Sequence, residues 1–180
     1  HDKDLVYGGS GDDWITGASD DDVLYGDHGN GAAHQLNSGA DDCTERDGSA
    51  VFDSGEDGHD LILGGSGADF IDGEGGHDEL YGQGGFDEML GGEGDDLMKG
   101  GDQADVMDGE SGNDTMSGNE GNDSMRGDLG DDTMSGGDGN DVMDGEEGAD
   151  WMAGNDGNDD MFGGTGNDWM HGGTGFDDMF

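Results

Sequence analysis

The chain has 180 residues, of which 44 are glycine, none is proline and one is cysteine, and its 48 acidic residues against 4 basic ones give a formal net charge of −44. An apolar content of only 28% excludes an ordinary layered core, and the scarcity of basic residues excludes nucleic acid and anionic lipid as partners. No apolar run approaches the roughly 20 residues that span a bilayer, so no membrane insertion is expected, and the lone Cys43 excludes an internal disulfide.

Residues 1–30 contain repeats of nine residues. Residues 8–16 and 17–25 are two copies, residues 1–7 are the end of an earlier copy, and another copy begins at Gly26. Residues 31–54 lose this phase until Val51 to Asp53, which predict a strand that resumes the pattern. We therefore expect residues 31–54 to be an insertion that leaves the surface of one repeat and returns to it, as repeat proteins tolerate, with a dedicated binding loop as the alternative.

Residues 55–180 divide without a gap into fourteen nonapeptides. Position 1 is glycine and position 6 is aspartate in every copy, while position 4 is glycine in thirteen copies and glutamine at Gln103. Position 8 is apolar throughout and holds all eleven methionines of the chain. Scattered disorder does not produce such a phase, so the acidic composition does not predict an unfolded chain.

Each nonapeptide predicts a turn followed by a short strand. The glycines of positions 1 to 6 allow a turn with positive φ, because glycine has no β-carbon to clash. Positions 7 to 9 alternate out, in and out, so a three-residue strand buries only position 8. Such a strand cannot fold alone, and stacked copies would join their position-8 side chains into one internal ladder.

The pattern glycine-glycine-x-glycine-x-aspartate-x-apolar-x, as in residues 64–72 and 136–144, resembles the calcium-binding nonapeptide of RTX proteins. The resemblance implies an all-β fold, a right-handed parallel β-roll solenoid with two nonapeptides per coil and residues 18 apart stacked above each other. It also implies that the position-6 aspartates bind calcium together with backbone carbonyls, each ion being shared by nonapeptides two apart. The predicted metal ligands are Asp13, Asp22, Asp60, Asp69, Asp78, Asp87, Asp96, Asp105, Asp114, Asp123, Asp132, Asp141, Asp150, Asp159, Asp168 and Asp177.

Stacked aspartates require a counter-charge. At a strand spacing of about 4.8 Å, two unit charges repel by about 3.5 kcal/mol at an effective dielectric constant of about 20. The bare stack is therefore not expected to form. Calcium suits the turns because it accepts six to eight oxygen ligands in a loose geometry, whereas magnesium needs a stricter octahedron. The resemblance implies multiple calcium ions, about twelve or more.

Two further groups of residues have alternative interpretations. His59 and His77 both occupy position 5, where turn residues are favoured over a zinc site because no third ligand accompanies them. Trp151 and Trp169 share position 7 near the C-terminal end, either as ordinary outward packing or as a docking patch or carbohydrate platform. The sequence has no plausible Ser/His/Asp grouping, isolated acid pair or phosphate loop, so an enzyme is not expected.

These features predict an extracellular structural module that folds when it meets calcium. The resemblance implies a secreted or cell-surface bacterial protein, exported by type I secretion and folding outside the cell. One hypothesis is a structural or assembly module of a surface protein or filament, in which other copies stack end to end. The alternative is the calcium and secretion module of a type I-secreted enzyme or toxin whose catalytic domain lies outside this chain.

Overall fold

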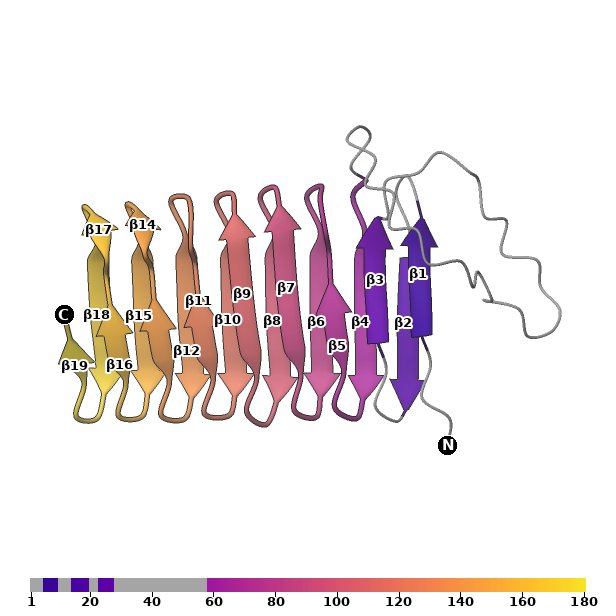
Figure 1. Ribbon diagram of the computed structural model, residues 1–180. Coiled ribbons are helices and arrows are strands. Elements are labelled where there is room, and N and C mark those ends of the chain that lie inside the picture. The colour runs from indigo at the N-terminus through magenta and orange to yellow at the C-terminus, as the bar shows by residue number, and fades with distance from the viewer. Residues whose placement is uncertain (1–4, 10–13, 20–22, 28–57) are drawn as a thin grey trace, which may run out of the picture.

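The computed structural model describes residues 5–9, 14–19, 23–27 and 58–180, in which short parallel strands stack into a solenoid (Figure 1). From β4 onward, strands of one sheet alternate along the chain with strands of the other, and tight turns connect them (Figure 1). The predicted all-β parallel solenoid with two nonapeptides per coil is confirmed, with about seven coils of 18 residues.

Two sheets make up the described strands. Sheet A contains, in spatial order, β1 (Leu5–Gly9), β3 (Val23–Asp27), β5 (Phe70–Asp72), β7 (Glu88–Glu93), β9 (Val106–Ser111), β11 (Ser124–Arg126), β13 (Val142–Asp144), β16 (Asp160–Phe162) and β19 (Asp178–Met179). Sheet B contains β2 (Trp14–Ser19), β4 (Leu61–Ser66), β6 (Glu79–Gly84), β8 (Leu97–Asp102), β10 (Thr115–Glu120), β12 (Thr133–Asp138), β15 (Trp151–Asp156) and β18 (Trp169–Thr174). A further pair, β14 (Glu147–Gly148) and β17 (Thr165–Gly166), lies within turns.

The register between neighbouring strands repeats the sequence period. Met116 pairs with Met98 on one side and Met134 on the other, both 18 residues away. The pairs that bridge the predicted insertion have a longer offset, since β2 pairs with β4 and β3 pairs with β5 at an offset of 47 residues. The strands before and after the predicted insertion are therefore neighbours in one stack.

The core consists of the position-8 side chains of both sheets, which lie between them. Ile15, Leu24, Ile62, Ile71 and Leu80 begin it, and methionines from Met89 to Met161 continue it; each of these side chains is at most 4% exposed. Because Cβ atoms alternate along a strand, the neighbours at positions 7 and 9 point outward. The predicted methionine ladder is confirmed as the interior of the solenoid.

Many strands are longer than the three residues that the repeat predicts. Strand β4 continues from Leu61 to Ser66, and both Ile62 and Gly64 are buried within it. Position 1 of the next nonapeptide is thus a second inward position, which only glycine occupies. Turns that lead from sheet B to sheet A form one edge of the solenoid, the Asp69 edge, and turns that lead from sheet A to sheet B form the opposite edge, the Asp78 edge.

Candidate metal sites in the turns

The position-6 aspartates are buried although they lie in turns. Asp168 and Asp177 in the last described coil are half-buried, and Asp13 and Asp22 lie outside the described residues. The other twelve are each at most 3% exposed: Asp60, Asp69, Asp78, Asp87, Asp96, Asp105, Asp114, Asp123, Asp132, Asp141, Asp150 and Asp159. The structure therefore brings the predicted ligands into two buried columns, one along each edge.

One carboxylate oxygen of each aspartate holds the coils in register. The Asp96 N–H donates a hydrogen bond of 2.8 Å to Asp114 Oδ1, and the Asp114 N–H donates one of 2.8 Å to Asp132 Oδ1. The same bond recurs at every step from Asp60 to Asp168 on one edge and from Asp69 to Asp177 on the other. Oδ1 is thus already used by the protein.

The second carboxylate oxygen, Oδ2, has a different environment. In ten aspartates it is buried and has no hydrogen-bond partner among the described residues: Asp78, Asp87, Asp96, Asp105, Asp114, Asp123, Asp132, Asp141, Asp150 and Asp159. A buried polar atom without a partner costs roughly 1–3 kcal/mol, and more when it is charged. An unpaired oxygen repeated at ten equivalent places points to an interaction with a group outside the chain.

In each of these ten turns Oδ2 lies against the position-1 glycine, and in all of them except the Gly100 turn a carbonyl of the next coil borders the same space. A β-carbon placed on Gly91 would lie 2.7 Å from Asp96 Oδ2 and 2.8 Å from the carbonyl oxygen of Gly109, and Gly64 and Gly73 have the same surroundings. The space beside position 1 is therefore lined by oxygens from two successive coils. Glycine is required there because any side chain would fill this space.

Burial changes the acidity of these carboxyls when no cation is present. Desolvation raises the pKa of Asp78, Asp105 and Asp114 from the ordinary 3.8 to about 7, against the opposing effect of the backbone N–H that each accepts. It raises the pKa of Asp87 and Asp132 to about 6. The folded turns therefore resist the charged form of their own aspartates, which a bound cation would stabilise.

The available donors fit a hard cation. The described residues contain no cluster of three or more His, Cys, Asp or Glu side chains that could hold a metal ion, so side chains alone do not complete a site. Backbone carbonyls such as that of Gly109 supply neutral oxygens next to the carboxylates. Calcium accepts mixed carboxylate and carbonyl oxygens at about 2.3–2.6 Å, so the residues present fit this ion.

The turns use positive φ at position 2 and, in most copies, at position 4. Seven of the position-2 residues are not glycine and have φ between 64° and 78°: Glu74, Gln83, Glu110, Asn119, Asp128, Glu146 and Asn155. The expectation that glycine supplies the positive φ of the turn is thus incomplete. The mixture of residue types at position 2 concealed this left-handed conformation, although Asn and Asp are enriched there in general.

Position 5 forms a second ladder in the opposite direction, which the sequence did not reveal. The Asp131 N–H donates to Asn113 Oδ1 at 2.9 Å, so here each side chain accepts from the coil that follows. His77 has the same role, since its Nδ1 accepts the Asp95 N–H at 2.6 Å and its ring stacks on His59 at 5.1 Å. These contacts agree with the interpretation of the two histidines as turn residues.

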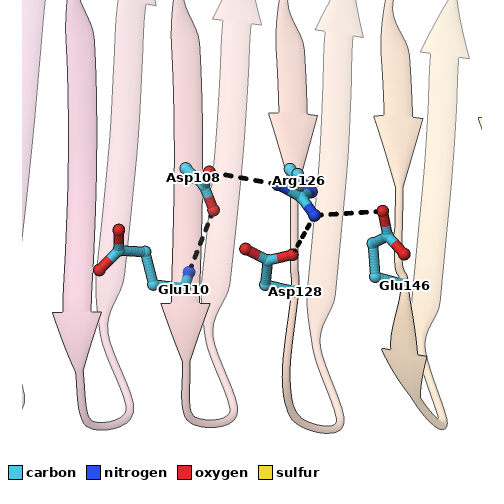
Figure 2. A network of polar contacts seen from close by, with 5 residues as sticks. All are labelled: Asp108, Glu110, Arg126, Asp128 and Glu146. Atoms are coloured by element: carbon cyan, nitrogen blue, oxygen red, sulfur yellow. Dashed lines mark hydrogen bonds and ion pairs between the residues drawn. The ribbon is translucent and has the colours of Figure 1, made fainter.

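An exposed ion-pair network connects three coils at the entrance to the Asp78 edge (Figure 2). Arg126 Nη2 lies 2.5 Å from Asp128 Oδ1 and 3.2 Å from Glu146 Oε1, and its Nη1 lies 4.0 Å from Asp108 Oδ2. In Figure 2, Asp108 also accepts a hydrogen bond from the backbone N–H of Glu110, at 3.2 Å. Arg126 therefore places a positive charge among acidic side chains of successive coils.

The aromatic pairs near the C-terminal end stack face to face. Trp151 and Trp169 have ring centroids 5.1 Å apart with planes 10° from parallel, and Phe162 and Phe180 lie 4.9 Å apart at the same angle. The facing surfaces of each pair cover one another. This geometry disfavours a carbohydrate platform, which needs ring faces open to the ligand, and favours packing between coils.

Among the described residues, no helix is long and apolar enough to cross a membrane.

The model of the RTX calcium-binding nonapeptide repeat, which spans four copies, matches residues 2–31, 54–89, 81–116, 117–152 and 144–179. These matches leave residues 32–53 uncovered, which is where the nine-residue phase is lost. No curated protein matches the chain.

Proposed function

Because the chain belongs to the family of RTX calcium-binding nonapeptide repeats, and is a calcium-binding β-roll module, we propose that its position-6 aspartates hold calcium ions between successive coils. The buried Oδ2 atoms without partners, which in most turns share the space beside position 1 with a carbonyl of the next coil, carry this proposal. The ligands proposed are all sixteen predicted aspartates, together with backbone carbonyls of the turns. With each ion shared between nonapeptides two apart, residues 55–180 would bind twelve ions.

Charge explains why the ion would control folding. The chain carries a net charge of −44, and the folded turns bury twelve aspartates in two columns. Calcium supplies the positive charge that neutralises these buried carboxylates. Because the site does not exist in the unfolded chain, the free energy of calcium binding contributes to the free energy of folding. We therefore propose that the module is unfolded at the low calcium concentration of a cytoplasm and folds at extracellular calcium.

RTX repeats are typical of secreted bacterial proteins, and we propose that this module has a structural or assembly role in such a protein at the cell surface or in a filament. The parallel 18-residue register between neighbouring coils supports this role, because the strands at an end of such a stack offer unpaired backbone groups to a further coil. A second copy stacked on such an end could continue the same 18-residue register. Sedimentation at several protein concentrations with calcium present would test end-to-end stacking, and a strictly monomeric module would contradict it.

The domain organisation belongs to the same proposal. Residues 1–30 would form repeats of the same roll as residues 55–180, and residues 31–54 would be an insertion between them. The shared 47-residue offset of the β2–β4 and β3–β5 pairs supports this division. Removing residues 31–54 should leave calcium-dependent folding unchanged, as measured by circular dichroism during calcium titration.

Replacing a position-6 aspartate by asparagine keeps the size of the side chain and Oδ1 but removes the charge, and so tests whether these residues are calcium ligands. Asp114→Asn with Asp132→Asn should lower the number of ions bound in calorimetry, because adjacent sites on the Asp78 edge lose their anionic oxygens. The matched control, Asp138→Asn with Asp156→Asn, removes the same charge from exposed position-3 side chains and should leave the number unchanged. Equal stoichiometry in both variants would remove the assignment of position 6, and β-structure that persists in excess chelator at neutral pH would contradict calcium-driven folding.

A further inference from the structure

Gln103 is the one departure from glycine at position 4 in the fourteen contiguous copies, and the backbone changes where it stands. Ten position-4 glycines have φ between 133° and 154°, whereas Gln103 has φ of 77°. The reason is steric, because a β-carbon placed on Gly85 would collide with the carbonyl oxygen of Gly67 in the preceding coil. A residue with a β-carbon cannot adopt the glycine conformation there and turns to the left-handed region instead.

The altered turn is held less firmly to both neighbouring coils. The position-4 N–H normally donates to the position-3 carbonyl of the next coil, as from Gly112 to Leu129 at 2.8 Å. The bond into the Gln103 turn, from Gly85 to Asp102, is 3.3 Å long and is the longest of this series. Within the described residues, the Gln103 N–H makes no such bond to the next coil.

The aspartate ladder continues through this turn. The Asp87 N–H donates to Asp105 Oδ1 at 2.9 Å, and the Asp105 N–H donates to Asp123 Oδ1 at 2.8 Å. Asp105 is 1% exposed, and its Oδ2 has no partner among the described residues, as in the other turns. The charges to be neutralised are therefore unchanged, while the backbone that surrounds them is less fixed.

The opposite edge provides an internal reference in the same coils. Position 4 is glycine in all of its described turns, including Gly94 and Gly112 in the nonapeptides directly before and after the one that contains Gln103. The Gly94 N–H donates to the Ser111 carbonyl at 2.7 Å. The two edges therefore present the same carboxylate columns with different backbone support at one level.

We infer that Gln103 creates two weak calcium sites in the interior of the array, those that its turn shares with residues 82–87 and with residues 118–123. This inference rests on the proposed function of the turns. An ion at either site must also order a turn that inter-coil hydrogen bonds hold less well, and such loss of preorganisation lowers affinity. The column on the Asp69 edge is thereby divided into two blocks that fill before the sites between them.

Amide exchange of the whole chain, followed by NMR at increasing calcium concentration, tests this order. The amides of Asp87 and Asp105 should become protected at about threefold to tenfold higher calcium than those of Asp96 and Asp114, the range expected from the loss of about one hydrogen bond. Gln103→Gly should remove this delay. Gln83→Gly is the matched control, because it lies at position 2, where φ is 76° and glycine is also common, and it should leave the delay intact.

A transfer variant makes the test independent of any general gain in stability. Gly121→Gln should extend late protection to the Asp123 amide. Simultaneous protection of both edges in the unchanged chain would overturn the inference while leaving calcium-driven folding in place, and so would a delay that survives Gln103→Gly. Amide protection that does not respond to calcium anywhere would instead overturn the proposed function itself.

Discussion

The methionine ladder and the aspartate ladder of this solenoid are buried to the same degree but contribute opposite signs to its stability. Met116 and Asp114 are each 1% exposed and lie two residues apart in one nonapeptide. Removing the thioether side chain from water stabilises the fold, whereas removing the carboxylate from water costs free energy until a partner is supplied. In every coil, stacking therefore buries a methionine side chain that stabilises the fold and an aspartate side chain that needs a bound cation.

Calcium removal should have the largest effect, because the aspartates lose their partner and the chain unfolds, which also exposes the methionines. With calcium, hydrogen peroxide should leave the nine methionines from Met89 to Met161 largely unoxidised, because each is at most 2% exposed. In excess chelator all eleven methionines should form sulfoxides at similar rates. Peptide mass spectrometry measures the pattern, and protection that is equal in both conditions would show that the interior does not depend on the ion.

Acidification should partly replace calcium. In the metal-free folded state, burial raises the pKa of Asp105 and Asp114 to about 7, while the unfolded chain keeps values near 3.8. The folded state then binds protons more tightly, so this contribution is fully present below about pH 4 and is lost as pH rises through 6 to 7. In chelator, β-structure measured by circular dichroism should therefore increase between pH 8 and pH 4.

The same titration with saturating calcium separates protons from ions as partners of the carboxylates. At neutral pH the calcium-loaded chain should already be folded, so acidification should add no β-structure there. A chelated chain that stays unfolded at every pH would contradict the assignment of burial as the cause of the raised pKa values.

Periodicity made the register and both ladders predictable from the sequence. A period of nine with two copies per coil aligns residues 18 apart, so Asp114 is expected below Asp132 and Met116 below Met134, as observed. Invariance at position 6 and an unbroken apolar position 8 identify chemistry that each coil repeats. These predictions succeed because each of these two positions has the same environment in every coil and therefore keeps the same kind of residue.

Features that depend on torsion angles or on single substitutions could not be predicted in this way. Position 2 mixes glycine with four polar residue types, so its left-handed backbone leaves no invariant residue. The reason for glycine at position 1 was also different from the expected one, because Gly91 is required by the oxygens of Asp96 and Gly109 rather than by a positive φ. The period places Trp151 and Trp169 at the same position of neighbouring coils, but it does not determine their side-chain torsion angles, so the parallel stacking of their rings could not be predicted.

A substitution that creates a cavity in the methionine ladder tests how closely the interior of one coil is packed. Met125 lies between Met107 and Met143 in sheet A and is 2% exposed. Met125→Ala should lower the free energy of unfolding at saturating calcium by about 2–5 kcal/mol, and Met125→Leu, which conserves volume, by less than about 1.5 kcal/mol. Urea unfolding measures both values, and equal losses would contradict a closely packed interior at this position.

Substitution of Arg126 should have the smallest effect on stability, because its ion pairs lie on the surface whereas the proposed calcium sites are buried. Its side chain is 48% exposed, and exposed ion pairs are weak and screened by salt, even when one guanidinium contacts Asp108, Asp128 and Glu146. Arg126→Gln should therefore lower the melting temperature slightly at low salt and hardly at all at high salt, with no change in calcium stoichiometry. Lys99→Gln removes the same charge from sheet B, where Lys99 lies over the Tyr81 ring at 5.2 Å and no acidic network surrounds it among the described ion pairs. A salt-independent loss in Arg126→Gln that exceeds the loss in Lys99→Gln would show that this network acts as part of the interior rather than as a surface contact.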